Sequence, residues 1–176
     1  MSMKTTFFSI VLGALLIFGC IGGSGDSKDT IETYGINFKL GNGWEIGSSS
    51  YDPLTDYGFI TLQYNLVVRD LNLSFVNSSS INIDSQITQK KTELSLGGTF
   101  VEGGNVTIYG HENIAYILYN MSLHNREYYE YFLIWYCNLS YRTYTLSIRD
   151  YFMYSSASLN VSRAEFLYII SRIEDH

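Results

Sequence analysis

The chain has 176 residues, of which 46% are hydrophobic and 16% charged, a composition that suits one domain with a buried core behind a short leader. A formal net charge of −6 argues against a nucleic-acid partner, because nucleic-acid phosphates require a basic surface. Sixteen Tyr residues against a single Pro favour a fold rich in β-strands.

The N-terminus has the pattern of an export signal. Lys4 precedes an apolar stretch at residues 7–18, which has the length of a signal-peptide core and falls short of the roughly 20 residues of a membrane-spanning helix. The segment ends in Leu16-Ile17-Phe18-Gly19-Cys20, which resembles the lipobox of lipoproteins, where the cysteine takes the lipid. With the Gly- and Ser-rich residues that follow, it is similar to archaeal lipoproteins in particular.

We therefore predict a lipoprotein signal peptide at residues 1–20, lipidation at Cys20, and a flexible tether at residues 21–33. An uncleaved leader that stays as a single transmembrane anchor is the alternative, since no charge lies between Lys4 and Asp26. Both interpretations leave Lys4 inside and the domain outside, attached to the membrane at its extracytoplasmic face.

The acceptor triplet for N-glycosylation, Asn-x-Ser/Thr, occurs six times, against about two expected by chance from the Asn, Ser and Thr content. The candidate sites are Asn72, Asn77, Asn105, Asn120, Asn138 and Asn160. Crowding of Asn and Ser into loops is the alternative explanation of this excess. Glycans at some of these sites would require an extracytoplasmic domain.

Alternation of apolar and polar residues predicts the first strands of the domain. Strands are expected at residues 34–40, 44–47 and 58–69, with a tight turn at residues 41–43 and a loop at residues 51–57. Residues 70–80 are ambiguous, because Leu71, Leu73 and Phe75 alternate like a strand while residues 77–80 have the composition of a loop.

A helix is expected at residues 83–96, where Ile83, Ile87 and Leu94 share helical spacing and Gly97-Gly98 closes the segment. Four strands should follow, at residues 99–109, 114–121, 127–137 and 141–149. The second and third of these strands are apolar on both faces, so they belong at the centre of a layered structure.

The final helix is expected to start at Ser162, because Ser162-Arg163-Ala164-Glu165 matches a capping box, in which two side chains satisfy free backbone N–H groups. Val161 and Phe166 occupy the positions of a hydrophobic staple. The predicted buried stripe of this helix consists of Phe166, Leu167, Ile170 and Ile173.

This order of elements, opening with residues 34–38 and Gly43-Trp44, resembles the PsbP-like fold, which includes the photosystem subunit PsbP and bacterial envelope lipoproteins of the DcrB type. The closing strand and helix, at residues 141–148 and 166–173, resemble the end of that domain. The resemblance implies an α+β fold over residues 34–176, with an antiparallel β-sheet and helices packed on its two faces. It also implies that the domain binds or supports other proteins.

No catalytic, cofactor or metal site is predicted. His111, His124 and His176 are scattered along the chain, whereas a metal needs converging ligands. The Gly-x-Ser-x-Gly elbow of serine hydrolases is missing from the domain, and Cys137 lies on an apolar face, which favours a buried thiol. For the aromatic strand at residues 128–136, core packing is expected on its inward side, and an aromatic ligand surface is the alternative.

These observations predict a membrane-anchored extracytoplasmic lipoprotein that binds or supports a partner protein of the cell envelope, without enzymatic activity, cofactor or nucleic acid. A small-molecule-binding module that uses the aromatic face is the alternative. An envelope hydrolase is a third hypothesis, and it would need titratable residues that converge in a pocket.

Overall fold

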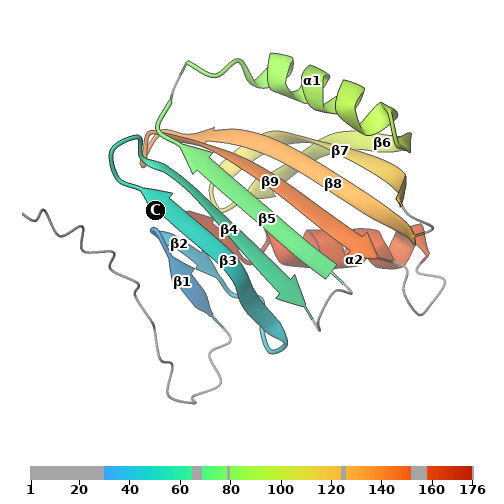
Figure 1. The fold of residues 1–176 in the computed structure, drawn as a ribbon, viewed down its shortest axis with the longest axis horizontal. Coiled ribbons are helices and arrows are strands. Elements are labelled where there is room, and N and C mark those ends of the chain that lie inside the picture. The colour runs from blue at the N-terminus through green and yellow to red at the C-terminus, as the bar shows by residue number, and fades with distance from the viewer. Residues whose placement is uncertain (1–29, 65–68, 79, 124–125, 152–157, 176) are drawn as a thin grey trace, which may run out of the picture.

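The computed structural model describes residues 30–64, 69–78, 80–123, 126–151 and 158–175 (Figure 1). The predicted signal peptide, Cys20 and most of the predicted tether lie outside these ranges. In the described part of the chain, neither helix is both long and apolar enough to cross a membrane.

The described residues form ten strands and two helices. The strands are β1 (Ile31–Thr33), β2 (Ile36–Phe38), β3 (Trp44–Asp52), β4 (Tyr57–Tyr64), β5 (Arg69–Val76), β6 (Gly98–Ile108), β7 (His111–Leu123), β8 (Arg126–Cys137), β9 (Arg142–Tyr151) and β10 (Ile173–Asp175). The helices are α1 (Ile83–Ser95), between β5 and β6, and α2 (Leu159–Ile170), between β9 and β10.

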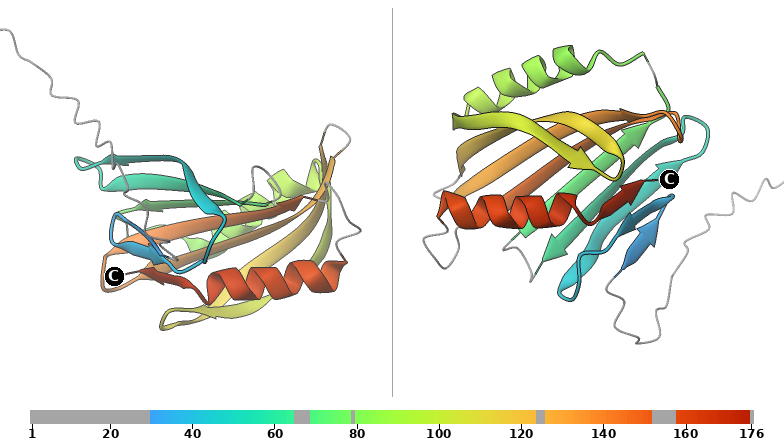
Figure 2. Two further views of the ribbon diagram at one scale, coloured as in Figure 1. Left: turned by 90° about the horizontal axis from the view of Figure 1, so that it is seen from below. Right: turned by 180° about the vertical axis from the view of Figure 1, so that it is seen from behind.

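Seven strands make one antiparallel sheet in the order β3-β4-β5-β9-β8-β7-β6. The three short strands make a second sheet in the order β1-β2-β10, which joins the two ends of the domain. This small sheet and α2 lie side by side on the same face of the large sheet (Figure 2). We call this the core face, and the opposite face of the large sheet the open face.

The main hydrophobic core lies between the large sheet and the elements on its core face. It contains residues that are fully buried on the small sheet, such as Phe38, on the large sheet, such as Leu146, and on α2, such as Ile169. A smaller cluster on the opposite side of β7 and β8 packs under α1, whose one buried residue is Leu94. Strands β7 and β8 are thus covered on both faces, which confirms their predicted central place in the layers.

The predicted fold class is wrong. Strands make up 59% of the structure and helices 19%, and the helices do not cover both faces of the sheet. The core face is shared by α2 and the small sheet, and α1 makes its sheet contacts with the β6, β7 and β8 end, so the open face of the other strands has no helical layer. The physical reason is the length of the helices. Helices of 13 and 12 residues are too short to span all seven strands of the large sheet.

The small sheet was not predicted, because strands of three residues are too short to show a periodic pattern. Strand β1 lies before the first strand expected at residues 34–40. A turn with positive φ at Tyr34 (53°) and Gly35 (80°) replaces the start of that expected strand, and its later residues form β2. Ile173, expected at the end of the last helix, lies instead on β10 and pairs with Phe38.

The start of the last helix also differs from its prediction. Helix α2 begins at Leu159, and the side chain of Ser158 caps it by accepting from the backbone N–H of Val161. Ser162 is 1% exposed and its hydroxyl accepts from the Tyr131 phenol at 3.2 Å, so a core contact replaces the expected cap. Leu167, expected in the buried stripe, is 53% exposed.

Candidate functional site

Strand β3 is a free edge of the large sheet. Among the described residues it pairs with β4 alone, and the seven residues from Glu45 to Tyr51 are all exposed. Along such an edge every second residue points its backbone N–H and C=O away from the sheet, where they can pair with another strand. The strand contains no Lys, Arg or Pro, the residues that commonly protect an edge.

The other edge of the sheet, β6, is less suited to pairing. Its register against β7 shifts twice, between Phe100 and Glu102 and between Val106 and Ile108. Each such bulge twists the strand and breaks the row of regularly spaced backbone groups. Strand β3 has one shift, between Ile46 and Ser48, and its residues 48–52 pair regularly with β4.

Side chains of β3 differ on its two faces. Ser48 and Ser50 pair with Thr61 and Phe59 and therefore lie on the open face, while Ser49 pairs with the buried Ile60 and lies on the core face. Ile46 is 48% exposed at this edge. The edge thus offers free backbone groups, small side chains and one exposed aliphatic side chain.

The open face carries a hydrogen-bonded chain of polar side chains across β4, β5 and β9. Thr61 donates to Asn72 Oδ1 at 2.9 Å, and Asn72 Nδ2 donates to Asp70 Oδ1 at 3.0 Å. The Tyr151 phenol donates to Asp70 Oδ2 at 2.9 Å. Burial raises the pKa of the Asp70 carboxyl above its ordinary value, and burial together with Asp70 raises the pKa of Tyr151 to about 12.

Glu130 on β8 is the centre of a second polar group on this face. It is 2% exposed, and it accepts from Ser147 Oγ at 3.0 Å and from Arg149 Nε at 3.3 Å. Lys90 Nζ on α1 lies 3.6 Å from Glu130 Oε1. Glu130 therefore ties α1 to the sheet, and its partners satisfy the charge that burial would otherwise penalise.

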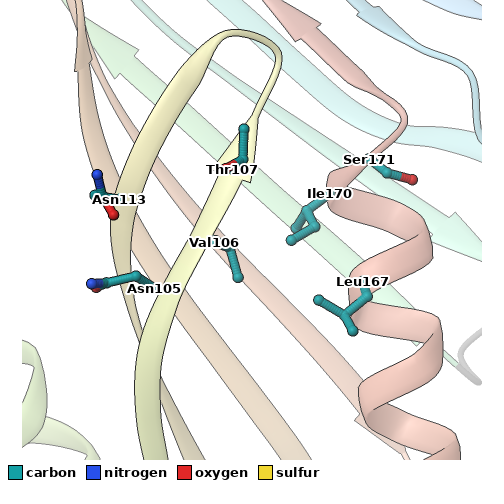
Figure 3. Close-up of a pocket in the computed structure, with 7 residues that line it drawn as sticks. All are labelled: Asn105, Val106, Thr107, Asn113, Leu167, Ile170 and Ser171. Atoms are coloured by element: carbon teal, nitrogen blue, oxygen red, sulfur yellow. The ribbon is translucent and has the colours of Figure 1, made fainter.

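A cavity lies beside each helix. Under α1, a cavity of about 180 Å³ is lined by Thr61, Asn72, Lys90, Phe132 and Arg149, among others. On the core face, a shallow cavity of about 380 Å³ lies between the β6–β7 hairpin and α2, where Val106, Leu167 and Ile170 point toward one another (Figure 3). None of the described residues that line the second cavity is titratable, so it offers no group for acid–base chemistry.

The six candidate glycosylation sites fall in different environments. Asn77 and Asn138 are exposed where β5 and β8 end, Asn105 is exposed on β6, and Asn160 is exposed in the first turn of α2. Asn120 is half-buried on β7, and Asn72 is half-buried on β5 within the polar chain described above.

Of the other residues considered from the sequence, His111 and Trp135 line one cavity of about 450 Å³, together with Asp84 and Glu112. The aromatic strand became β8, whose Tyr128, Tyr131 and Trp135 are 6%, 1% and 3% exposed, so these rings belong to the core. Cys137 is fully buried with a free thiol. His111 begins β7, while His124 and His176 lie outside the described residues. The described residues contain no cluster of His, Cys, Asp and Glu that could hold a metal.

Sequence reasoning missed both the free edge and the polar groups of the open face. Glu130, Ser147 and Arg149 come together because β8 and β9 pair in register, Glu130 opposite Arg149. The one signal available was the polar alternation of β5 and β9, whose outward residues include Asp70, Asn72, Ser147 and Arg149.

No family model and no curated protein matches the chain, so no family match supports the PsbP-like resemblance. Among solved structures, the chain is similar to LpqN, described as involved in cell envelope biogenesis of Mycobacterium tuberculosis, with a TM-score of 0.48 and 13% identity over 78% of this chain and 81% of that one. A similarity this weak carries no conclusion about activity, location or partners.

Proposed function

We propose that the protein is a non-enzymatic binding module, held at the extracytoplasmic face of a membrane by its N-terminus, that takes an extended segment of an envelope protein along the free edge of β3. The observation that carries this proposal is the exposed strand β3, uncharged between Glu45 and Asp52 and unpaired on one side among the described residues. A partner strand would extend the open face of the sheet by one strand.

The energetics favour a protein partner at this edge. Backbone hydrogen bonds along residues 48–52 would supply affinity without requiring a particular sequence, and alternate side chains of the partner would lie on the two faces. The exposed Ile46 offers a contact for one apolar side chain of the partner. The small Ser48 and Ser50 leave room for bulky side chains on the open face.

The sequence of the leader supports the proposed location. Lys4, the apolar residues 7–18 and Cys20 match an exported lipoprotein, and an uncleaved anchor would give the same topology. The candidate glycosylation sites fit the same compartment.

Two carboxylates of the open face, Glu130 and Asp70, favour binding over catalysis. Glu130 is buried and contacts three partners, and both carboxylate oxygens of Asp70 accept hydrogen bonds. A general base needs a carboxylate that can reach a substrate proton. Of the β8 rings that the small-molecule hypothesis relied on, Tyr128, Tyr131 and Trp135 are buried, which weakens that hypothesis at this strand, although Tyr129 and Tyr136 are half-buried.

Proline substitutions in β3 test the proposal. Neighbouring residues of a strand point their backbone N–H groups to opposite sides. One of the two variants Ser49→Pro and Ser50→Pro therefore removes a hydrogen bond to β4, and the other removes a donor from the free edge. The variant that keeps the wild-type urea midpoint is the edge variant. Ser49→Ala and Ser50→Ala are matched controls that keep the N–H group.

Full-length protein in detergent should capture an envelope protein by photo-crosslinking from β3, and the complex should slow hydrogen exchange of residues 48–52. The edge proline variant should lose both effects, and the alanine controls should keep them. Capture that survives the edge proline variant, or a complex that leaves exchange of β3 unchanged, would contradict the proposal.

A further inference from the structure

Four side chains form a row across the large sheet at the end that faces α2. The register places Trp44 opposite Tyr64, Tyr64 opposite Arg69, and Arg69 opposite Asp150, on four successive strands. The rings of Trp44 and Tyr64 have centroids 5.5 Å apart, and the guanidinium carbon of Arg69 lies 5.8 Å from the centroid of Tyr64. Rigid, paired strands therefore hold two aromatic rings and a guanidinium side by side.

Helix α2 closes this row into a groove. Glu165 and Tyr168 of α2 line it from one side, Trp44, Tyr64 and Arg69 from the other, and Asn42 lies at its mouth in the turn before β3. The groove has a volume of about 410 Å³, within the range of small-ligand sites. Tyr168 is 42% exposed, and Trp44 and Tyr64 are half-buried, so the rings are open to a ligand.

The charges of the groove are already balanced. Arg69 donates from Nε to Asp150 Oδ1 at 3.1 Å and from Nη1 to Glu165 Oε2 at 3.3 Å, so one cation lies between two carboxylates. The guanidinium of Arg172 lies 5.3 Å from the centroid of the Tyr168 ring and adds a second positive charge. A strongly charged ligand would therefore meet an equal number of like and opposite charges.

Arg69 is held in place by a buried carboxylate. Asp150 is 4% exposed and does not line the groove, so it orients Arg69 without meeting a ligand itself. The polar side chains that line the groove include Asn42, Arg69 and Glu165, and they can form hydrogen bonds with the hydroxyl groups of a neutral ligand.

From these contacts we infer that the groove formed by Trp44, Tyr64, Arg69, Glu165 and Tyr168 binds a neutral saccharide. Indole and phenol rings provide flat apolar surfaces for the C–H face of a sugar ring. Arg69, Glu165 and Asn42 provide donors and acceptors for its hydroxyls. The site lies on the core face at the α2 end of the sheet and does not depend on the partner strand proposed for β3.

Tryptophan fluorescence can test this inference, because the two tryptophans differ in exposure. Trp44 lines the groove, while Trp135 is 3% exposed in the core and stacks on Tyr144. Full-length protein in a detergent without a sugar headgroup is titrated with methyl glycosides and disaccharides of glucose, galactose, mannose and N-acetylglucosamine. At least one should give a saturable change in Trp44 emission at millimolar concentration.

Tyr168→Ala should weaken this binding by roughly threefold to tenfold, the effect of losing one aromatic contact. Tyr57→Ala is the matched control, since Tyr57 is 46% exposed and lies on the open face. Dodecyl glycosides that bind more tightly than their methyl forms would identify a glycolipid as the source, and equal binding would identify the sugar alone.

The inference is overturned if no sugar of this panel gives a saturable change, or if Tyr168→Ala binds as well as the Tyr57→Ala control. It is also overturned if tetramethylammonium or inorganic phosphate binds more tightly than every sugar, because either result would mean that the groove selects charge.

Discussion

Arg142 on β9 holds Asp56 in the turn between β3 and β4 through two parallel hydrogen bonds, of 2.6 Å from Nη2 to Oδ1 and 3.0 Å from Nε to Oδ2. The same guanidinium donates from Nη1 to the carbonyl of Tyr34 at 3.0 Å and lies 4.4 Å from the centroid of Phe75. One side chain thus connects the turn of the small sheet, the turn before β4 and the main core, and it fixes the end of the free strand β3.

Arg142→Lys should lower the free energy of unfolding by about 1–3 kcal/mol, because an ammonium cannot reproduce the paired hydrogen bonds. Hydrogen bonding to Arg142 holds the pKa of Asp56 below its ordinary value, so its contribution is present above the unfolded pKa and is lost as pH falls through the folded pKa. Urea unfolding of the wild type and variant measures both effects. Equal stability of the two proteins at neutral pH would contradict the expected role.

Tyr131 should make the domain sensitive to alkali. It is 1% exposed, stacks on Phe166 at 4.1 Å, and burial raises its pKa from 10.0 to about 12. The folded chain then keeps the phenol proton that the unfolded chain loses, so the free energy of unfolding should fall by about 1–2 kcal/mol as pH rises through this window.

The Tyr131→Phe variant should show a shallower fall of stability with alkali, measured by urea unfolding at a series of pH values. Burial also raises the pKa of Tyr151 to about 12, so the double variant with Tyr151→Phe should be shallower still. Identical slopes for the wild type and both variants would exclude these phenols as the cause.

Gly58 on β4 should not tolerate a side chain. A Cβ atom there would lie 2.3 Å from Cζ of Phe75, which is itself 1% exposed and enclosed by other aromatic rings. Gly58→Ala should therefore cost about 1–3 kcal/mol of unfolding free energy. Gly97→Ala is the matched control, because its Cβ would lie at an ordinary 3.5 Å from Met121 and its stability should stay within about 0.5 kcal/mol.

Glycan mapping of the native protein should separate the candidate sites by exposure. Asn77 and Asn138 are exposed at strand ends and should carry glycans. Asn72 should stay bare, because its amide donates to Asp70 and accepts from Thr61 within a strand that is paired on both sides. Peptide mass spectrometry measures this directly, and a glycan at Asn72 would mean that modification precedes folding of β5.

The parts of the fold that follow from local pattern could be predicted. The helix expected at residues 83–96 agrees with α1, and the strands expected to be apolar on both faces agree with β7 and β8. Both features can be recognised from the pattern of consecutive residues. The capping pattern at Ser162 gave a wrong helix start. The Ser162 hydroxyl accepts a hydrogen bond from the buried Tyr131, and Ser158 caps the helix instead.

Features that depend on distant pairing could not be predicted. Residues 48–52 show no apolar alternation, and that they form a free edge follows only from the order of strands in the sheet. The groove is lined by Trp44, Tyr64 and Arg69 and by residues of α2 that lie more than 90 positions away in the chain. No residue spacing in the sequence could therefore predict it. The α+β prediction failed because the two helices are too short to cover both faces of the seven-stranded sheet.

The claim that the domain works outside the cell, held at a membrane, is tested most directly by the intact mass of the native protein in fractionated cells. The account predicts a membrane-bound chain that begins at Cys20 and carries added lipid, with hexoses on exposed asparagines. A full-length chain in the membrane fraction would indicate the uncleaved anchor. An unmodified chain that begins at Met1 and is found free in the cytosol would contradict the account.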